Sequence, residues 1–80
     1  MLEIPLDLDI GSGWRALRAQ VPDVSSGSVA LVTFGKGNQV HFARLDLGKQ
    51  ILIDSVPTDV SSAMLEHIVG RVVTEYGQPN

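Results

Sequence analysis

The chain has 80 residues, 44% of them hydrophobic and 19% charged, which is the size and composition of one small folded domain. Six basic and nine acidic residues give a net charge of −3, and the basic residues are scattered, which disfavours direct binding to DNA or RNA. The absence of cysteine excludes disulfides, thiolate nucleophiles and zinc ribbons. We expect a single domain over residues 1–80, with residues 77–80 as a short C-terminal tail.

The N-terminus has no basic and apolar leader of the kind that forms a signal peptide. The longest apolar run is also far short of the ~20 residues that span a bilayer. These features predict a cytoplasmic protein without a membrane partner. A chain this short buries only about 60% of its unfolded surface, so a homodimer, which would bury more, is a further expectation.

The first ten residues alternate strictly between apolar and polar side chains. A period of two is typical of a strand that buries one face. Pro5 has no backbone N–H to donate, which places this strand at an edge of its sheet. The apolar positions are Leu2, Ile4, Leu6, Leu8 and Ile10.

A Gly-Ser-Gly run ends this strand, and its serine is a candidate helix cap. Trp14, Leu17 and Val21 follow at positions i, i+3 and i+7, a spacing that indicates one apolar stripe of a helix. We therefore predict a short helix that starts at Trp14 and ends before Pro22. Residues 23–27 are predicted to form a loop.

Three further strands are predicted from apolar and β-branched runs at residues 28–34, 40–46 and 51–56. A glycine-rich turn at residues 35–38 joins the first two.

The second hairpin has two possible registers. One pairs Leu45 with Leu52, and the other pairs Phe42 with Ile53. We favour the second, because it gathers four large apolar side chains on one side of the sheet. A slip of one residue would exchange the two faces of a strand.

A long amphipathic helix is predicted after residue 57, capped by Thr58 or Asp59 and ended at Gly77. The element order is then β-α-β-β-β-α. This order predicts an α+β two-layer sandwich, in which a four-stranded, mostly antiparallel sheet carries both helices on one face. The expected core residues of the last helix are Leu65, Ile68 and Val72.

Catalytic and metal-binding patterns are absent from the sequence. In the favoured register His41 faces Asp54, and a carboxylate beside an imidazole can orient a general base. No nucleophile is placed beside them, so a polar pair across the hairpin is the simpler interpretation. The spacings of metal sites and of phosphate-binding loops are also missing. We predict no enzyme, no cofactor and no metal.

Three carboxylates project from the polar side of the first strand. At a rise of about 3.4 Å per residue, neighbours two positions apart are separated by about 6.8 Å. A row of this kind could bind a basic protein groove through arginine side chains. The alternative is a solvated strand face whose charges discourage aggregation. The residues are Glu3, Asp7 and Asp9.

The build of the chain, which is small, acidic, free of cysteine and without a catalytic set, resembles phage-borne inhibitors of host defence such as anti-CRISPR proteins. The resemblance is one of type and involves no shared residue motif. It implies an acidic inhibitor or adaptor that docks on a basic surface of a nucleic-acid-handling complex, without binding nucleic acid itself.

The function predicted from the sequence is therefore a small non-catalytic protein-binding module, with Glu3, Asp7 and Asp9 as partner-binding residues. A homodimeric structural or assembly subunit is the first alternative, with a strand edge or a leftover apolar face as its interface. A small-ligand or hydrolytic site at His41 and Asp54 is the second alternative.

Overall fold

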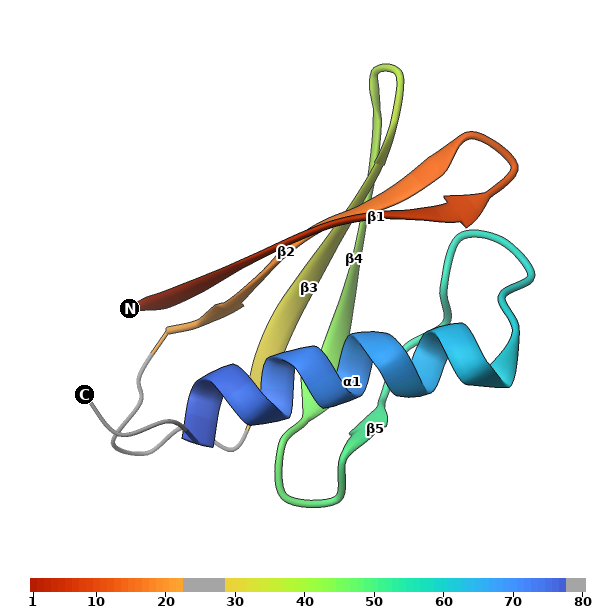
Figure 1. Ribbon diagram of the computed structural model, residues 1–80. Helices are drawn as coiled ribbons and strands as arrows, with labels where there is room; N and C mark the ends of the chain where they lie inside the picture. The colour runs from red at the N-terminus through yellow and green to blue at the C-terminus, as the bar shows by residue number, and fades with distance from the viewer. Residues whose placement is uncertain (23–28, 78–80) are drawn as a thin grey trace.

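The computed structural model describes residues 1–22 and 29–77, and the described part contains five strands and one helix (Figure 1). Neighbouring strands pair antiparallel in the order β1-β2-β3-β4-β5, so the sheet is a simple meander. The elements are β1 (Leu2–Gly11), β2 (Trp14–Val21), β3 (Val29–Lys36), β4 (Gln39–Asp46), β5 (Ile51–Leu52) and α1 (Ser62–Gly77).

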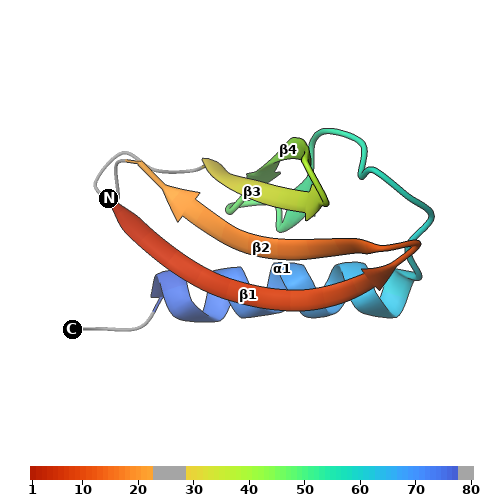
Figure 2. The same ribbon diagram turned by 90° about the horizontal axis from the view of Figure 1, so that it is seen from above.

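The helix α1 lies along one face of the sheet, and β1 and β2 bend along its length (Figure 2). The protein is thus an α+β domain with an antiparallel sheet, as predicted, but the sheet is curled and the domain has five strands and one helix in place of four and two. The loop predicted at residues 23–27 and residues 78–80 of the predicted tail lie outside the described residues, whereas Gly77 is the last residue of α1. No helix in the described part of the chain is both long and apolar enough to cross a membrane.

The segment predicted as the first helix is the strand β2, so that prediction is wrong. Its Gly-Ser-Gly run forms a hairpin turn in place of a helix cap, with Gly11 paired to Trp14. The backbone φ angles of Ser12 and Gly13 are 55° and 82°. Positive φ at both central residues is typical of the two-residue turn whose twist matches antiparallel strands.

A bulge in β2 explains why its sequence imitates a helix. The pairing with β3 shifts between Ala16 and Arg18, which leaves Leu17 as an extra residue. Ala16 and Ala19 are both fully buried although they are three positions apart. An uninterrupted strand would place them on opposite faces, so the bulge turns a period of two into a local spacing of three.

The second hairpin adopts the register that we did not favour, with Leu45 opposite Leu52. Its turn is closed by Asp46, whose carbonyl accepts from Gln50 N at 2.7 Å and whose carboxylate accepts from Lys49 N at 2.9 Å. These bonds fix a turn of four residues between Asp46 and Ile51, whereas the favoured register has a loop of only two residues. The two registers differ by two residues, so each places the same side chains on the same face.

The helix α1 begins later than predicted, because Ser61 caps it. The Ser61 side-chain oxygen accepts from Met64 N at 3.1 Å, so neither Thr58 nor Asp59 is the cap. The helix ends at Gly77, as predicted.

The core lies between α1 and the inner face of the sheet, by which we mean the face that α1 covers. Ile68 and Val72 of α1 are fully buried, as predicted, whereas Leu65 is only partly buried. Burial of both sheet and helix side chains in this layer stabilises the domain. The largest fully buried side chains of the inner face are Phe34, Ile4, Leu45, Val21 and Val32, whereas Thr33, also buried, pairs with Phe42 and points to the opposite face.

Candidate functional site: the uncovered face of the sheet

The side of the sheet opposite α1, here called the outer face, has no described element packed on it. In β4 the side chains of Ala43 and Leu45 point inward and are fully buried. Side chains alternate along a strand, so Val40, Phe42 and Arg44 point to the outer face, where each is exposed.

Five of the six large hydrophobic side chains that the described residues expose lie on this face, and the sixth is Met1. Their exposed fractions run from 38% to 58%. We call these five, with the partly buried Leu31 between them, the apolar patch. The five are Val29, Val40, Phe42, Ile51 and Ile53.

The strand register makes the apolar patch continuous. Leu31 pairs with Arg44, and Ile53 N donates to the Arg44 carbonyl at 2.8 Å, so these three residues form one row across three segments. Phe42 lies two positions before Arg44 on the same strand and face. Diagonal neighbours in a sheet are about 7–8 Å apart, within reach of an aromatic ring. Arg44 therefore occupies the middle of the apolar patch, and Phe42 lies next to it along β4.

One ion pair sits within the apolar patch. The Arg44 guanidinium donates two hydrogen bonds to the Asp54 carboxylate, each 2.9 Å long, and Arg44 N donates to the same carboxylate at 3.0 Å. The hydrogen bonds from Arg44 hold the pKa of Asp54 well below its usual range. The same pairing raises the pKa of Arg44. The two charges thus cancel locally, and the fork-shaped pairing fixes the segment after β5 against β4.

This pairing predicts a pH-dependent contribution to stability. The pKa of Asp54 in the folded protein lies below the ~3.9 of an aspartate in an unfolded chain. The contribution is therefore fully present above about pH 4 and is lost as the pH falls through the folded pKa. We expect Asp54→Asn to lower the melting temperature relative to the parent at pH 7, by a difference that shrinks in strong acid.

Thermal melts of the parent and of Asp54→Asn at pH 7, 5, 3 and 2 check this prediction. Asp59→Asn, at another exposed position, controls for the loss of one negative charge. A deficit as large at pH 2 as at pH 7 would show that the ion pair does not cause it.

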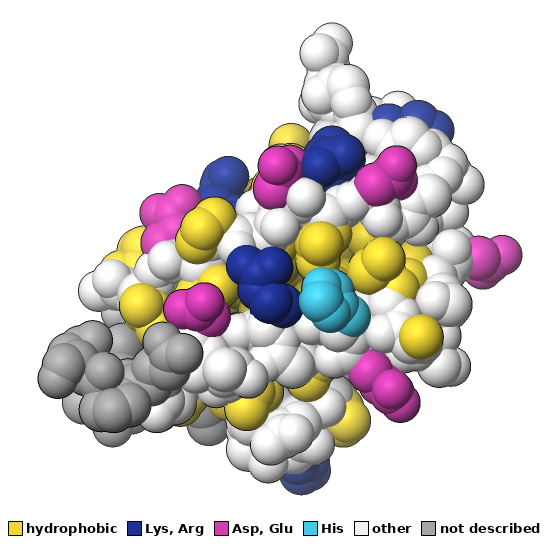
Figure 3. All heavy atoms as spheres, in the orientation of Figure 1, with side chains coloured by type: hydrophobic (Ala, Val, Ile, Leu, Met, Phe, Trp, Pro, Cys, Tyr) yellow, Lys and Arg dark blue, Asp and Glu magenta, His cyan; other side chains and the backbone are white. Residues whose placement is uncertain are grey.

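The three carboxylates of the predicted partner-binding row are all exposed, but two of them have arginine partners on β2. The Asp7 carboxylate accepts from Arg15 Nη2 at 2.8 Å, and Glu3 lies 3.8 Å from Arg18 Nε. Asp9 accepts a hydrogen bond from Gly11 N at 2.9 Å. Figure 3 shows acidic and basic side chains alternating over β1 and β2. The row is therefore partly neutralised within the chain.

Sequence reasoning missed this neutralisation because it assigned Arg15 and Arg18 to a helix. In a strand next to β1 they lie diagonally across from the carboxylates, since each arginine contacts the acidic residue two positions from its pairing partner in β1. A cross-strand arrangement of opposite charges is a common stabilising pattern in sheets. The Gly-Ser-Gly run, which favours a two-residue hairpin turn, was the signal in the sequence that could have indicated a second strand.

His41 and Asp54 do not form the pair that the favoured register predicted. His41 Nε2 donates to the Ser55 carbonyl at 2.7 Å, and its ring meets Phe34 edge-on at 6.1 Å between centroids. Asp54 instead binds Arg44. Each group thus has another partner in the structure.

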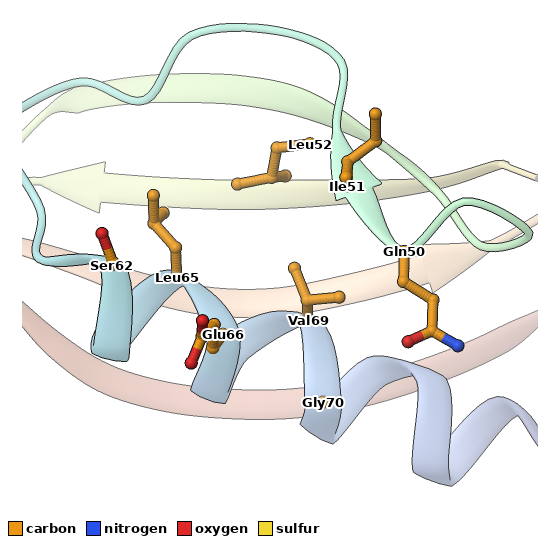
Figure 4. A pocket seen from close by; sticks show the side chains of 8 residues that line it. All are labelled: Gln50, Ile51, Leu52, Ser62, Leu65, Glu66, Val69 and Gly70. Atoms are coloured by element: carbon orange, nitrogen blue, oxygen red, sulfur yellow. The ribbon is translucent and has the colours of Figure 1, made fainter.

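A groove of about 500 Å³ lies between β5 and α1 (Figure 4). The side chains of Leu52, Leu65 and Val69 point into it, whereas Ile51 points away from the helix toward the outer face. Polar side chains line the rest of the groove, namely Gln50, Ser62 and Glu66. Among residues 1–22 and 29–77 there is also no cluster of three or more His, Asp or Glu side chains that could hold a metal ion.

The outer face is thus the most extensive feature that folding leaves unexplained. Phe42 and its apolar neighbours remain in water there, while ion pairs neutralise the adjoining charges. No protein-family model matches this chain, no curated protein matches its sequence, and no solved structure matches its fold.

Proposed function

We propose that the protein is a non-catalytic protein-binding module whose interface is the outer face of its sheet. The observation that carries the proposal is the apolar patch, whose aromatic member, Phe42, is 54% exposed. A large apolar side chain has roughly 150–200 Å² of surface, so the patch exposes on the order of 400 Å². Contiguous patches of about 300–600 Å² are the largest on typical monomers and often mark interaction sites.

Neither edge of the sheet is well suited to pair with a strand of a partner, which favours the outer face as the interface. A partner that added a strand beside β1 would need free backbone groups, but Pro5 has no N–H and its carbonyl accepts from Arg71 Nη2 at 2.9 Å. The Asp7 carbonyl accepts from Arg15 Nη2 at 2.9 Å, in a bulge where Asp7 has a φ of 51°. At the opposite edge, β5 has only two residues.

The inner face is occupied as well, because Ile68 and Val72 of α1 fill it. Among the described residues, five of the six exposed large hydrophobic side chains are therefore offered to a protein partner on the outer face. An apolar centre with a polar rim is the usual composition of a protein interface. The ion pair of Arg15 with Asp7 contributes to that rim, whereas the ion pair of Arg44 with Asp54 lies within the patch.

The narrower expectation, an inhibitor or adaptor that docks its acidic row on a basic surface of a nucleic-acid-handling complex, has less support. Asp7 already binds Arg15, and Glu3 lies near Arg18. A basic partner would have to compete with these internal partners, which lowers the gain from each contact. The acidic row is a secondary candidate, and its variant serves as the comparison in the test below.

The test compares proteins captured from cells of origin by three forms of the chain. Phe42→Thr with Ile53→Thr removes apolar area while keeping residues that favour strands. Asp7→Lys with Asp9→Lys reverses the acidic row. We expect proteins held by the parent and by the acidic-row variant to be lost by the apolar-patch variant. Retention of the same proteins by the apolar-patch variant would overturn the proposal, and their loss only with the acidic-row variant would favour the secondary candidate.

A further inference from the structure

We infer that the partner on the outer face is a second copy of this chain, with the two apolar patches packed against each other as two stacked sheets. The inference rests on the proposed function, because it names the occupant of the same face. It is carried by the charge and area of the apolar patch and by the position of Phe42 within it.

Charge favours a second copy. The chain as a whole carries −3, so most pairs of surfaces on two copies would repel each other. The apolar patch is an exception, because its guanidinium and carboxylate, from Arg44 and Asp54, already neutralise each other at 2.9 Å. An acidic foreign partner would find no unpaired positive charge in the patch, where the one carboxylate without an ion pair is Asp46, between Val29 and Ile51. Near Phe42, four positions from Asp46 along β4, two apolar surfaces of the same chain meet at little electrostatic cost.

The position of Phe42 suits a symmetric contact. A twofold interface brings the same patch of both chains together, and residues near the axis contact their own copies. Phe42 lies on β4 opposite Thr33 of β3, two positions before Arg44, whose neighbours on the adjoining segments are Leu31 and Ile53. An axis near Phe42 therefore packs ring against ring at the centre, with aliphatic side chains around it. Sheets stacked in this way lie about 10 Å apart, the thickness of one layer of side chains.

The area predicts a weak dimer. The apolar patch contributes on the order of 400 Å² per chain, or about 800 Å² for two, and interfaces below about 1,200 Å² belong to weak or transient complexes. We expect a dissociation constant in the range of tens of micromolar. The described chain exposes 4861 Å² in all, so the dimer covers a useful share of the surface of a domain with a small core.

Sedimentation equilibrium of the purified full chain from about 1 µM to 1 mM tests the inference. The parent should pass from the mass of one chain to that of two within this range. Phe42→Lys places like charges on each other across the axis and should weaken association at least 30-fold. Thr74→Lys adds the same charge on an exposed position of α1 and should associate like the parent.

Circular dichroism and thermal melts establish that each variant is folded, and Ile53→Lys replaces Phe42→Lys if the latter does not fold. A parent that keeps the mass of one chain up to 1 mM would overturn the inference, as would a Phe42→Lys variant that associates like Thr74→Lys. Failure of the inference is distinguishable from failure of the proposed function. If the parent is monomeric but its captured proteins are lost when Phe42 and Ile53 are replaced, the inference fails. The proposed function then holds, with a foreign protein as the partner.

Discussion

Replacing Phe34 with alanine is expected to lower the free energy of unfolding by about 3–5 kcal/mol at 25 °C. Phe34 is fully buried, and its ring meets His41 edge-on in the core. Truncation of a buried phenylalanine costs about 3–5 kcal/mol, through lost burial and the cavity that remains. A chain of 80 residues has a free energy of unfolding of about 4–12 kcal/mol in total, so this loss removes a large part of it.

The second phenylalanine provides a matched control, because Phe42 is 54% exposed on the outer face. Phe42→Ala removes the same atoms from a half-solvated site, and its cost to the monomer should stay below about 1.5 kcal/mol. Urea denaturation at low protein concentration measures both variants without a contribution from association. Equal losses for Phe34→Ala and Phe42→Ala would contradict the assignment of one face as core and the other as uncovered.

The next largest effect is expected for Ile68→Ala in α1. Ile68 is fully buried between the helix and the sheet, and alanine at such a site costs about 2–5 kcal/mol. Leu65, one turn earlier, is only partly buried and borders the groove beside β5. Leu65→Ala should therefore cost about 1 kcal/mol, since less apolar surface leaves a buried site.

Chemical denaturation of Ile68→Ala and Leu65→Ala, each compared with the parent, gives both free energies of unfolding. The difference in cost checks how α1 is rotated over the sheet. If Leu65→Ala is the more damaging variant, α1 buries a different stripe, and the groove between β5 and α1 is filled.

The elements with an undisturbed period were predictable from the sequence. The alternation in β1 indicated a strand with one buried face, and Pro5 placed it correctly at an edge of the sheet. The apolar stripe of α1 predicted the buried positions Ile68 and Val72. In both cases local spacing and tertiary packing require the same pattern, so the local pattern was sufficient.

The elements that depend on a local irregularity were not predictable in the same way. The bulge at Leu17 gave β2 a helical spacing, and a turn at Ser12 and Gly13 resembled a helix cap. The register of the β4–β5 hairpin followed from the hydrogen bonds of Asp46 in its turn, which hydrophobicity does not encode. These features arise from backbone geometry and polar contacts, to which periodicity is insensitive.

The candidate site was not predicted, because β2 had been assigned as a helix that would have added to the helical layer. The pattern of β4 is apolar on both faces, and the sequence correctly grouped Phe42 and Ile53 on one side of the sheet. In the predicted fold, with two helices on the other side of the sheet, this group of apolar side chains was not recognised as a candidate interface. With β2 in the sheet, the described chain has a single helix, which covers one face of a sheet that is apolar on both. The uncovered apolar face is the consequence.

Methyl signals in nuclear magnetic resonance spectra, recorded on the parent from about 20 µM to 1 mM, test most directly whether the outer face is an interface. Our account predicts that the methyl signals of Ile51 and Ile53 shift with concentration and that those of Ala63 and Thr74, on the exposed side of α1, do not. The fast exchange expected of a weak dimer moves such signals continuously between free and bound positions. Shifts centred on α1, with Ile51 and Ile53 unchanged, would place the interface on the helix and contradict the account.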